Sequence, residues 1–584
     1  MKKIITFGFA LMASATMFGQ TVLWDGENYD IGSKGDFWDR CNQEVVENPT
    51  KDGINTSDKC LKFTITGNEW NNGSAAKGLT CDAFFSSTDE TAQGTYYKPA
   101  VGYVGDPMPF YDPVAGDFKI MYLQDFRPNP SGTYHPIWAV STKDAANYES
   151  LGELVSCGNI NEQDAAIGTG STIYDESSKL YYTFYTGNKY NPTASDNGQA
   201  IMYATSSDFK TWTKCKSFIL KGDDYGYSKN DFRDPFLFKG DDGKYHMLVA
   251  TTKNGKGTIA DFISDDLKSW KDNGAFMNMM WDRFYECPDV FKMGDWWYLV
   301  YSDKTSFMRK VQYFKGRTLD ELKACTANDA GIWPDDHEGF LDSRGFYAGK
   351  TASDGTNRYI WGWCPTRKGK DNTEVGASPA EPEWAGNLVA HKLIQHEDGT
   401  LTLGEVEAIS NKYNKECEVE VKEQNGVTAS NGTYTLSGDN AYMLMSRLGY
   451  HNKISFTVTT SNEKDKFGIS LVRGTKSNTD DAMAFEKYYT MVVNPESDSR
   501  RKINFEQEGD GGKGFIEGID GYNFARPSDN VYNITIYTDN SICVMYINDA
   551  VCYTNRIYGI QKNCWSINNY GGNITVSNLK ISQY

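Results

Sequence analysis

Three carboxylic acids stand beside or near prolines at the openings of short apolar segments. They are Asp106 in GDPMPFYD (105–112), Asp234 in RDPFLFKG (233–240) and Glu286 in ECPDVFKM (286–293). Carboxylates that act without a metal suit glycoside hydrolysis, in which one attacks the anomeric carbon and another protonates the leaving oxygen. The attacking group must stay ionised, whereas the proton donor needs a raised pKa. The residue types do not say which acid takes which part.

Any one of these acids, taken alone, could equally cap a turn. The functional interpretation depends on an internal repeat between residue 101 and about residue 363. Each of five units opens with a turn-like motif and a short apolar segment, and an aromatic segment follows after a polar turn. The other two openings are GTGSTIYD (168–175) and SRGFYAGK (343–350), and the aromatic segments are 119–125, 179–187, 244–252, 296–303 and 358–363.

Five such units predict a five-bladed β-propeller over residues 100–405, with the opening strands around a central channel. We therefore expect the three acids, at corresponding places of their units, to share that channel. Residues 406–584 alternate apolar and polar positions in several short runs, as in 454–458, 532–537 and 542–547. This pattern predicts a C-terminal β-sandwich, so the expected fold class is all-β.

The first hundred residues divide into two parts. Residues 1–20 have a basic start and a short apolar run, the pattern of a cleavable signal peptide, which predicts a secreted or periplasmic protein. Residues 21–99 are turn-rich and predict a short β-rich extension, with a strand at 61–65. Three tryptophans of this extension could stack on sugar or fill a small core; they are Trp24, Trp38 and Trp70.

The bulk composition narrows the class of partner. The formal net charge of −18 argues against nucleic acid and anionic membranes, and no later segment is apolar and long enough to span a bilayer. An oligo- or polysaccharide is compatible with this charge and with 14% aromatic residues. The twelve cysteines include no CxxC pair and the six histidines no HExxH spacing, so we expect no metal and no cofactor. Oligomeric state is not indicated.

Two of the acidic motifs carry a family resemblance. RDP at 233–235 and ECPDVF at 286–291 resemble the hallmark motifs of glycoside hydrolase family 32, which holds invertases, inulinases and levanases. The resemblance extends from about residue 101 to the end. It implies a propeller followed by a sandwich, and retaining hydrolysis of β-fructofuranosyl linkages in fructans or sucrose-like sugars. It also implies that Asp106 is the nucleophile, Glu286 the acid/base and Asp234 the transition-state stabiliser.

The same resemblance implies a set of substrate-binding residues. Arg233 is expected to bond a substrate hydroxyl or to orient Glu286. The others match positions of family motifs: Gln124 a glutamine that closes the second strand, Trp138 a His-Ala-Val-Ser segment, Ser171 a Phe-Ser-Gly-Ser motif and Tyr347 an Asp-Phe-Tyr-Ala motif.

The first motif departs from the family pattern. The family has Trp-Met-Asn-Asp-Pro-Asn-Gly, whereas residues 103–109 read YVGDPMP, so both asparagines are missing. A site that loses such amides loses discrimination between substrates. The glycan therefore stays open, and so do two alternatives. One is an inverting arabinoside or xyloside hydrolase like those of family 43, and the other is a non-catalytic glycan-binding propeller.

Overall fold

The computed structural model describes residues 41–47, 59–66, 80–85, 94–127, 133–279, 283–304, 310–325, 338–367, 382–473, 489–495, 504–508, 515–521 and 526–584. The chain divides into two compact units, residues 1–93 and 94–584. The predicted signal peptide and the tryptophans at 24, 38 and 70 lie outside the described residues. The predicted boundaries at 21–99, 100–405 and 406–584 stay predictions.

The first unit contains a small antiparallel sheet. Its strands are β1 (Cys41–Glu47), β2 (Lys59–Thr66) and β3 (Thr80–Phe85), paired in that order. The strand predicted at 61–65 lies within β2.

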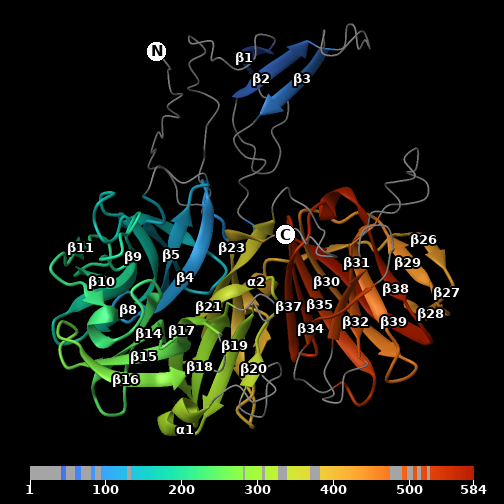
Figure 1. The fold of residues 1–584 in the computed structure, drawn as a ribbon. Coiled ribbons are helices and arrows are strands. Elements are labelled where there is room, and N and C mark those ends of the chain that lie inside the picture. The colour runs from blue at the N-terminus through green and yellow to red at the C-terminus, as the bar shows by residue number, and fades with distance from the viewer. Residues whose placement is uncertain are drawn as a thin grey trace. The chain divides into compact units, whose positions relative to one another are not determined.

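In the second unit, residues 103–404 form groups of antiparallel strands that follow one another along the chain (Figure 1). The first group is β4 (Tyr103–Asp112), β5 (Asp117–Asp125), β6 (Ile137–Thr142) and β7 (Glu149–Val155). The second is β8 (Ala166–Asp175), β9 (Leu180–Asn188), β10 (Gln199–Ser206), β11 (Thr213–Lys214) and β12 (Leu220–Lys221). The third is β13 (Phe232–Lys239), β14 (Tyr245–Lys253), β15 (Lys256–Ser264) and β16 (Lys271–Asn278). The fourth is β17 (Tyr285–Met293), β18 (Trp296–Asp303), β19 (Val311–Gly316) and β20 (Glu338–Phe340), and the last is β21 (Tyr347–Ser353), β22 (Arg358–Arg367), β23 (Pro382–Gln395) and β24 (Leu401–Gly404).

The opening strand of each group packs against the opening strands of its neighbours. β4 contacts β8, β8 contacts β13, β13 contacts β17, β17 contacts β21, and β21 returns to β4. This closed ring is the arrangement expected of a β-propeller, and each predicted opening motif overlaps one of its strands. A single pair, Gly386 with Val104, joins the last group to the first in one eight-stranded sheet. The count of five blades stays a prediction.

The opening strands share a β-bulge at one point in each unit. The register shifts lie between 105 and 108, 168 and 170, 233 and 236, 286 and 289, and 347 and 350. A bulge inserts an unpaired residue and redirects a side chain. Four of these bulges hold a non-glycine residue with positive φ, at Asp106 (29°), Asp234 (60°), Cys287 (54°) and Ala348 (53°).

This alignment corrects the expectation that all three acids occupy corresponding places. Asp106 and Asp234 are equivalent, because each sits in the bulge directly before a proline. In the fourth unit that place belongs to Cys287, before Pro288. Glu286 is one residue earlier, at the position of Arg233 in its own unit. Proline lacks an N–H and is tolerated where the ladder is interrupted, so proline rather than charge marks the register.

Residues 415–583 form two facing sheets (Figure 1). The first is ordered β27-β28-β39-β30-β35-β36-β37, with β25 on β39, and the second β26-β29-β38-β31-β32-β33-β34. Burial alternates residue by residue along β30, and a separate hydrophobic core lies between the sheets, as the alternating pattern predicts. The strands are β25 (Lys415–Cys417), β26 (Val421–Asn425), β27 (Val427–Ser430), β28 (Thr433–Ser437), β29 (Tyr442–Met445), β30 (His451–Thr460), β31 (Phe467–Arg473), β32 (Tyr489–Asn494), β33 (Asn504–Glu508), β34 (Phe515–Gly521), β35 (Val531–Asp539), β36 (Ile542–Ile547), β37 (Val551–Arg556), β38 (Cys564–Asn569) and β39 (Asn573–Gln583).

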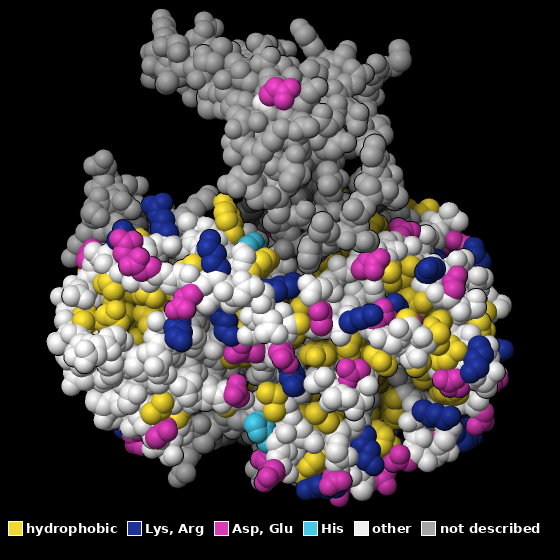
Figure 2. Space-filling model, turned by 180° about the vertical axis from the view of Figure 1, so that it is seen from behind, with side chains coloured by type: hydrophobic (Ala, Val, Ile, Leu, Met, Phe, Trp, Pro, Cys, Tyr) yellow, Lys and Arg dark blue, Asp and Glu magenta, His cyan; other side chains and the backbone are white. Residues whose placement is uncertain are grey.

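Helices are few and short within the described ranges. They are α1 (Leu319–Ala324), α2 (Glu407–Ser410) and the 3₁₀ turns η1 (Asp223–Tyr225) and η4 (Ile560–Lys562). No helix in the described ranges is long and apolar enough to cross a membrane. On the face seen in Figure 2, Lys and Arg side chains are interspersed with Asp and Glu side chains. The fold is therefore all-β, a propeller followed by a sandwich, as predicted.

The propeller and the sandwich share a buried core. Tyr537, Val544 and Tyr546 of the sandwich pack in the same cluster as Leu401 and Leu403 of β24. Polar contacts add to this junction, because the Arg556 guanidinium donates to the carbonyl oxygens of Cys364 (2.7 Å) and Pro365 (2.9 Å) in β22. Contacts with the sandwich thus fix the position of the last strand group of the propeller.

Candidate active site

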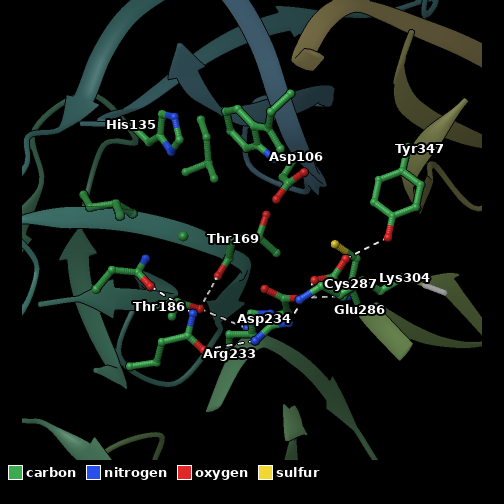
Figure 3. A pocket seen from close by; sticks show the side chains of 16 residues that line it. Asp106, His135, Thr169, Thr186, Arg233, Asp234, Glu286, Cys287, Lys304 and Tyr347 are labelled. Atoms are coloured by element: carbon green, nitrogen blue, oxygen red, sulfur yellow. Dashed lines mark hydrogen bonds and ion pairs between the residues drawn. The ribbon is translucent and has the colours of Figure 1, made fainter. Parts of the chain in front are cut away.

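The three acids predicted to do chemistry line one cavity of about 400 Å³ (Figure 3). Asp106 comes from β4, Asp234 from β13 and Glu286 from β17. Figure 3 shows the three side chains turned toward the same space, with Arg233 and Tyr347 on either side of Glu286. The ring of opening strands brings together residues that are 52 to 180 positions apart.

Both oxygens of Glu286 are held by donors. Arg233 Nη2 donates to Oε1 (3.0 Å), and the Tyr347 hydroxyl donates to Oε2 (2.7 Å). Arg233 is itself fixed, because its Nη1 donates to Asp231 Oδ1 (2.8 Å) and its guanidinium lies over the Phe284 ring (4.1 Å). The carboxylate of Glu286 is therefore oriented before any ligand arrives, as a proton-transfer group must be.

Asp234 is fixed by the backbone of its own bulge and of the next one. The Cys287 N–H donates to Asp234 Oδ2 (2.9 Å), and the Asp234 N–H donates to Thr186 Oγ1 (2.9 Å). Burial raises the pKa of Asp234, although the neighbouring Arg233 cation opposes that shift. The residue is 4% exposed, so the position of its side chain is set by the protein and not by solvent.

Asp106 has the most perturbed surroundings of the three. Burial, and then the negative charges of Asp234 and Glu286, raise its pKa to about 7. Two groups act in the opposite direction: Trp363 Nε1 donates to Asp106 Oδ1 (3.0 Å), and the buried cation of Lys350 lies nearby. Asp106 therefore holds its proton to a much higher pH than an ordinary carboxyl group does. Strongly perturbed carboxyl groups that line a cavity are characteristic of active sites.

The sequence agrees with this geometry over nearly the whole second unit. Residues 96–404 match the family model described as glycosyl hydrolases family 32 N-terminal domain, and residues 399–581 match the one described as GH32, BT1760-like, C-terminal domain. The chain belongs to glycoside hydrolase family 32. The fold and the family expected from RDP and ECPDVF are thereby confirmed.

Individual relatives of this family 32 chain are distant. It is 26% identical over 328 residues to "Beta-fructofuranosidase, insoluble isoenzyme CWINV2" of Arabidopsis thaliana. The aligned region covers 52% of this chain and 53% of that protein. It is 25% identical over 329 residues to "Sucrose-6-phosphate hydrolase" of Vibrio alginolyticus, with 52% and 61% covered. The chain thus spans about half to three fifths of these relatives' lengths. A similar solved structure is that of fructan 1-exohydrolase IIa from Cichorium intybus, with a TM-score of 0.61 at 15% identity, covering 83% of this chain and 97% of that one.

Two of the five predicted substrate-binding residues line the cavity, and three do not. Arg233 and Tyr347 line it and hold Glu286. Ser171 instead ties β8 to β13, since its hydroxyl donates to Pro235 O (2.9 Å) and accepts from Leu237 N (2.9 Å). Gln124 is buried, and its amide donates to Val101 O (2.5 Å). Trp138 packs against the main core and, edge-on, against Phe126.

Other residues that line the cavity were not predicted from the sequence. They are His135, Thr169, Thr186, Asn188, Gln199, Lys304 and Trp384, among others. Thr186, Asn188 and Gln199 lie at or near strand ends and carry no motif. Thr169 lies in the bulge of β8, within the opening motif at 168–175. Trp384 had no signature in the sequence either, because the glycine at position 105 does not indicate which distant residue packs against it.

One cluster of described residues has metal-binding side chains, and it does not line the cavity. Asp342, His391 and Cys552 lie at the propeller–sandwich junction, and all three are buried. Their donor types suit a transition metal. However, they bond to each other and to neighbours: His391 Nε2 lies 3.2 Å from Asp342 Oδ2, and its Nδ1 lies 2.8 Å from the Tyr546 hydroxyl. We therefore describe this cluster as a structural hydrogen-bond network.

Proposed function

We propose that this chain is a glycoside hydrolase that cleaves β-fructofuranosyl linkages in fructans or sucrose-like sugars with retention of configuration. The observation that carries the proposal is the convergence of Asp106, Asp234 and Glu286 on one cavity of a family 32 propeller. The relatives, a β-fructofuranosidase and a sucrose-6-phosphate hydrolase, support the fructosyl substrate class. Action outside the cytoplasm rests on the predicted signal peptide at residues 1–20.

Two steps follow from a retaining mechanism. Asp106 attacks the anomeric carbon while Glu286 gives its proton to the leaving oxygen, so that a covalent fructosyl–Asp106 ester forms and the aglycone leaves. Glu286 then takes a proton from water, which attacks the same carbon and releases fructose and the Asp106 carboxylate. Asp234, fixed between two backbone elements, accepts hydrogen bonds from substrate hydroxyls as positive charge develops on the ring.

The ionisation of the acids places a condition on these roles. The proton that binds with a pKa of about 7 resides on Asp106, whereas the first step needs it on Glu286. Strongly coupled carboxyl groups share their protons as a set. The productive arrangement therefore has the same charge as the site with Asp106 protonated, with the proton moved from Asp106 to Glu286. Arg233 and Tyr347, which fix both oxygens of Glu286, determine how that proton is presented.

The deciding experiment compares wild type, Glu286→Gln and the surface control Glu176→Gln on sucrose, inulin and levan. Glu286→Gln keeps the shape of the side chain but removes the transferable proton, so we expect kcat to fall about 10²- to 10⁴-fold. Glu176 is exposed and pairs with the exposed Lys179, so its variant should match wild type. Equal activity of Glu286→Gln and wild type would remove Glu286 from the mechanism.

The stereochemistry is followed in the same reaction by proton NMR of the first-formed sugar. Retention is expected, and inversion would favour the mechanism of the family 43-like alternative. Saccharide binding by wild type without hydrolysis would favour the glycan-binding alternative.

A further inference from the structure

We propose that Trp384 and His135 form an aromatic wall beside Asp106, and that this wall binds the apolar C–H face of the saccharide unit to be cleaved. The inference rests on the proposed function, because it assigns a substrate-recognition surface to the same cavity. Both residues line that cavity. Neither residue belongs to the motifs that carry the family resemblance.

The indole of Trp384 occupies the space that a side chain at position 105 would need. A Cβ atom on Gly105 would lie 2.2 Å from Trp384 Cη2, 2.6 Å from Cζ3 and 2.8 Å from Cζ2. Gly105 has no positive φ, so its backbone conformation does not require glycine. Glycine is required at this position because the indole ring approaches so closely. The six-membered ring of Trp384 therefore covers the residue directly before the candidate nucleophile.

The indole is one member of a row of rings. The His135 imidazole stacks on it at 4.1 Å between centroids, with 21° between the planes. On another side lies Trp363, at 6.0 Å, whose Nε1 bonds Asp106. Burial lowers the pKa of His135 to about 4, so the imidazole is neutral under ordinary conditions. His135 also has a positive φ of 63°, a conformation that costs about 1 kcal/mol or more outside glycine and is often found at functional sites.

A clamp holds the wall in place without a ligand. Arg127 Nη2 donates to the carbonyl oxygens of Trp384 (2.7 Å) and Ala385 (3.1 Å), and its Nη1 donates to Glu383 Oε2 (2.8 Å). Its Nε donates to Asp125 Oδ2 (2.6 Å). A guanidinium engaged on this many sides fixes the backbone that carries the indole. Ordering an aromatic side chain in advance lowers the entropy cost of binding.

The chemistry of this corner selects the kind of ligand. The wall is uncharged and aromatic, whereas Asp106, Asp234 and Glu286 present oxygens. A furanosyl ring has C–H groups that pack on aromatic faces and hydroxyls that bond carboxylates. The wall therefore recognises the sugar by packing against it, whereas a polar side chain at position 105 would recognise it by hydrogen bonding. A neutral sugar ring fits both halves of the site.

The test measures binding and turnover for Trp384→Ala and Trp384→Phe, with Trp296→Phe as the matched control. Trp296 is a partly exposed tryptophan over which Arg317 packs, and it does not line the cavity. We expect Trp384→Ala to raise KM for sucrose and inulin about tenfold with a smaller change in kcat, and Trp384→Phe to recover most of that loss. Calorimetric Kd values for fructose and 1-kestose should follow KM, and thermal unfolding should show that each variant folds.

A second pair of variants tests the packing directly. Gly105→Asn alone should clash with the indole and lower both stability and affinity. Combined with Trp384→Ala, the asparagine gains room, so the double variant should be no less stable than Trp384→Ala alone. Additive losses in the two single changes would contradict the contact.

The outcomes separate this inference from the proposed function. Unchanged KM and Kd in a folded Trp384→Ala variant would overturn the wall while leaving the hydrolase intact. Wild type that binds saccharide without cleaving it would overturn the proposed hydrolysis, and the Kd of the variants would still decide the wall. If wild type neither binds nor cleaves any of these sugars, both proposals are wrong.

Discussion

Asp106 and Asp342 are both aspartates placed in poorly solvated surroundings by the propeller, and their hydrogen bonding differs sharply. Asp342 Oδ1 accepts from the backbone N–H groups of Ser343 (2.6 Å) and Thr554 (2.7 Å), and its Oδ2 accepts from the Thr554 hydroxyl (2.5 Å). Asp106 accepts one hydrogen bond among the described residues, from Trp363.

The difference separates a structural carboxylate from a reactive one. Donors surround Asp342 and join the propeller to the sandwich, so no lone pair is left for a ligand. Asp106 lies near two other carboxylates and faces a cavity, so its charged form is disfavoured and its free oxygen is available. A carboxylate whose oxygens all accept hydrogen bonds stabilises the fold. A carboxylate with a free oxygen beside other negative charges has a raised pKa and can react with a ligand.

The largest expected effect is on activity, from Asp106→Asn. The amide keeps the Trp363 contact but cannot attack the anomeric carbon, so kcat should fall about 10³-fold or more. The stability of the variant, in contrast, should rise relative to wild type at neutral pH. A carboxyl whose folded pKa is raised contributes stability at low pH, and that contribution is lost as pH rises from the ordinary carboxyl range through about 7.

This prediction is checked by enzyme assay and by thermal unfolding at several pH values. Asp106→Asn should gain stability relative to wild type as pH rises from 5 to 8, because the variant lacks the ionising group. An inactive variant whose unfolding shifts in parallel with wild type at every pH would keep Asp106 in the mechanism but contradict its raised pKa.

Asp342→Asn, at the propeller–sandwich junction, should have the opposite pattern of effects to Asp106→Asn: it should lower stability and leave activity unchanged. An amide NH₂ in place of one carboxylate oxygen would face donors from Thr554 and His391, and a buried network broken on one side loses about 3 kcal/mol. Activity per folded molecule should be unchanged, since the cluster does not line the cavity.

Denaturant unfolding followed by tryptophan fluorescence measures the Asp342→Asn effect, and Asp295→Asn, on an exposed side chain, is the control that should stay within about 0.5 kcal/mol of wild type. An Asp342→Asn variant as stable as wild type would mean that the donors around Asp342 add nothing net to the fold.

The same contrast explains what could be predicted from the sequence. Period and turn chemistry predicted the strand groups and the sandwich, because β-strands repeat locally and the openings share their bulges. RDP and ECPDVF indicated Asp234 and Glu286, because both motifs are contiguous, and Asp106 followed from the repeat. The one-residue offset of Glu286 from Asp106 and Asp234 was not predicted, because the three units were aligned by their acids, whereas the proline marks the bulge.

Two of the substrate-binding predictions were made from motif position. Ser171 and Gln124 instead bond to backbone atoms, which the spacing of residues in the sequence does not reveal. The contact of Trp384 with Gly105 joins residues far apart in sequence and had no local signature.

The smallest effect, and the one that bears most directly on Asp106 as nucleophile, is the pH dependence of kcat/KM. The reacting form carries one proton shared by Asp106 and Glu286, and loss of that proton sets the basic limb, so kcat/KM should fall about tenfold per unit above a pH of about 7. Lys350 holds the pKa of Asp106 down, so Lys350→Met should move that limb to higher pH, whereas the partly exposed Lys392→Met should leave it in place. Rate profiles on sucrose across pH 4.5 to 9 measure both. A wild-type limb near the ordinary carboxyl pKa, unmoved by Lys350→Met, would show that the like charges around Asp106 do not control the reaction, and the contrast with Asp342 would then rest on hydrogen bonding alone.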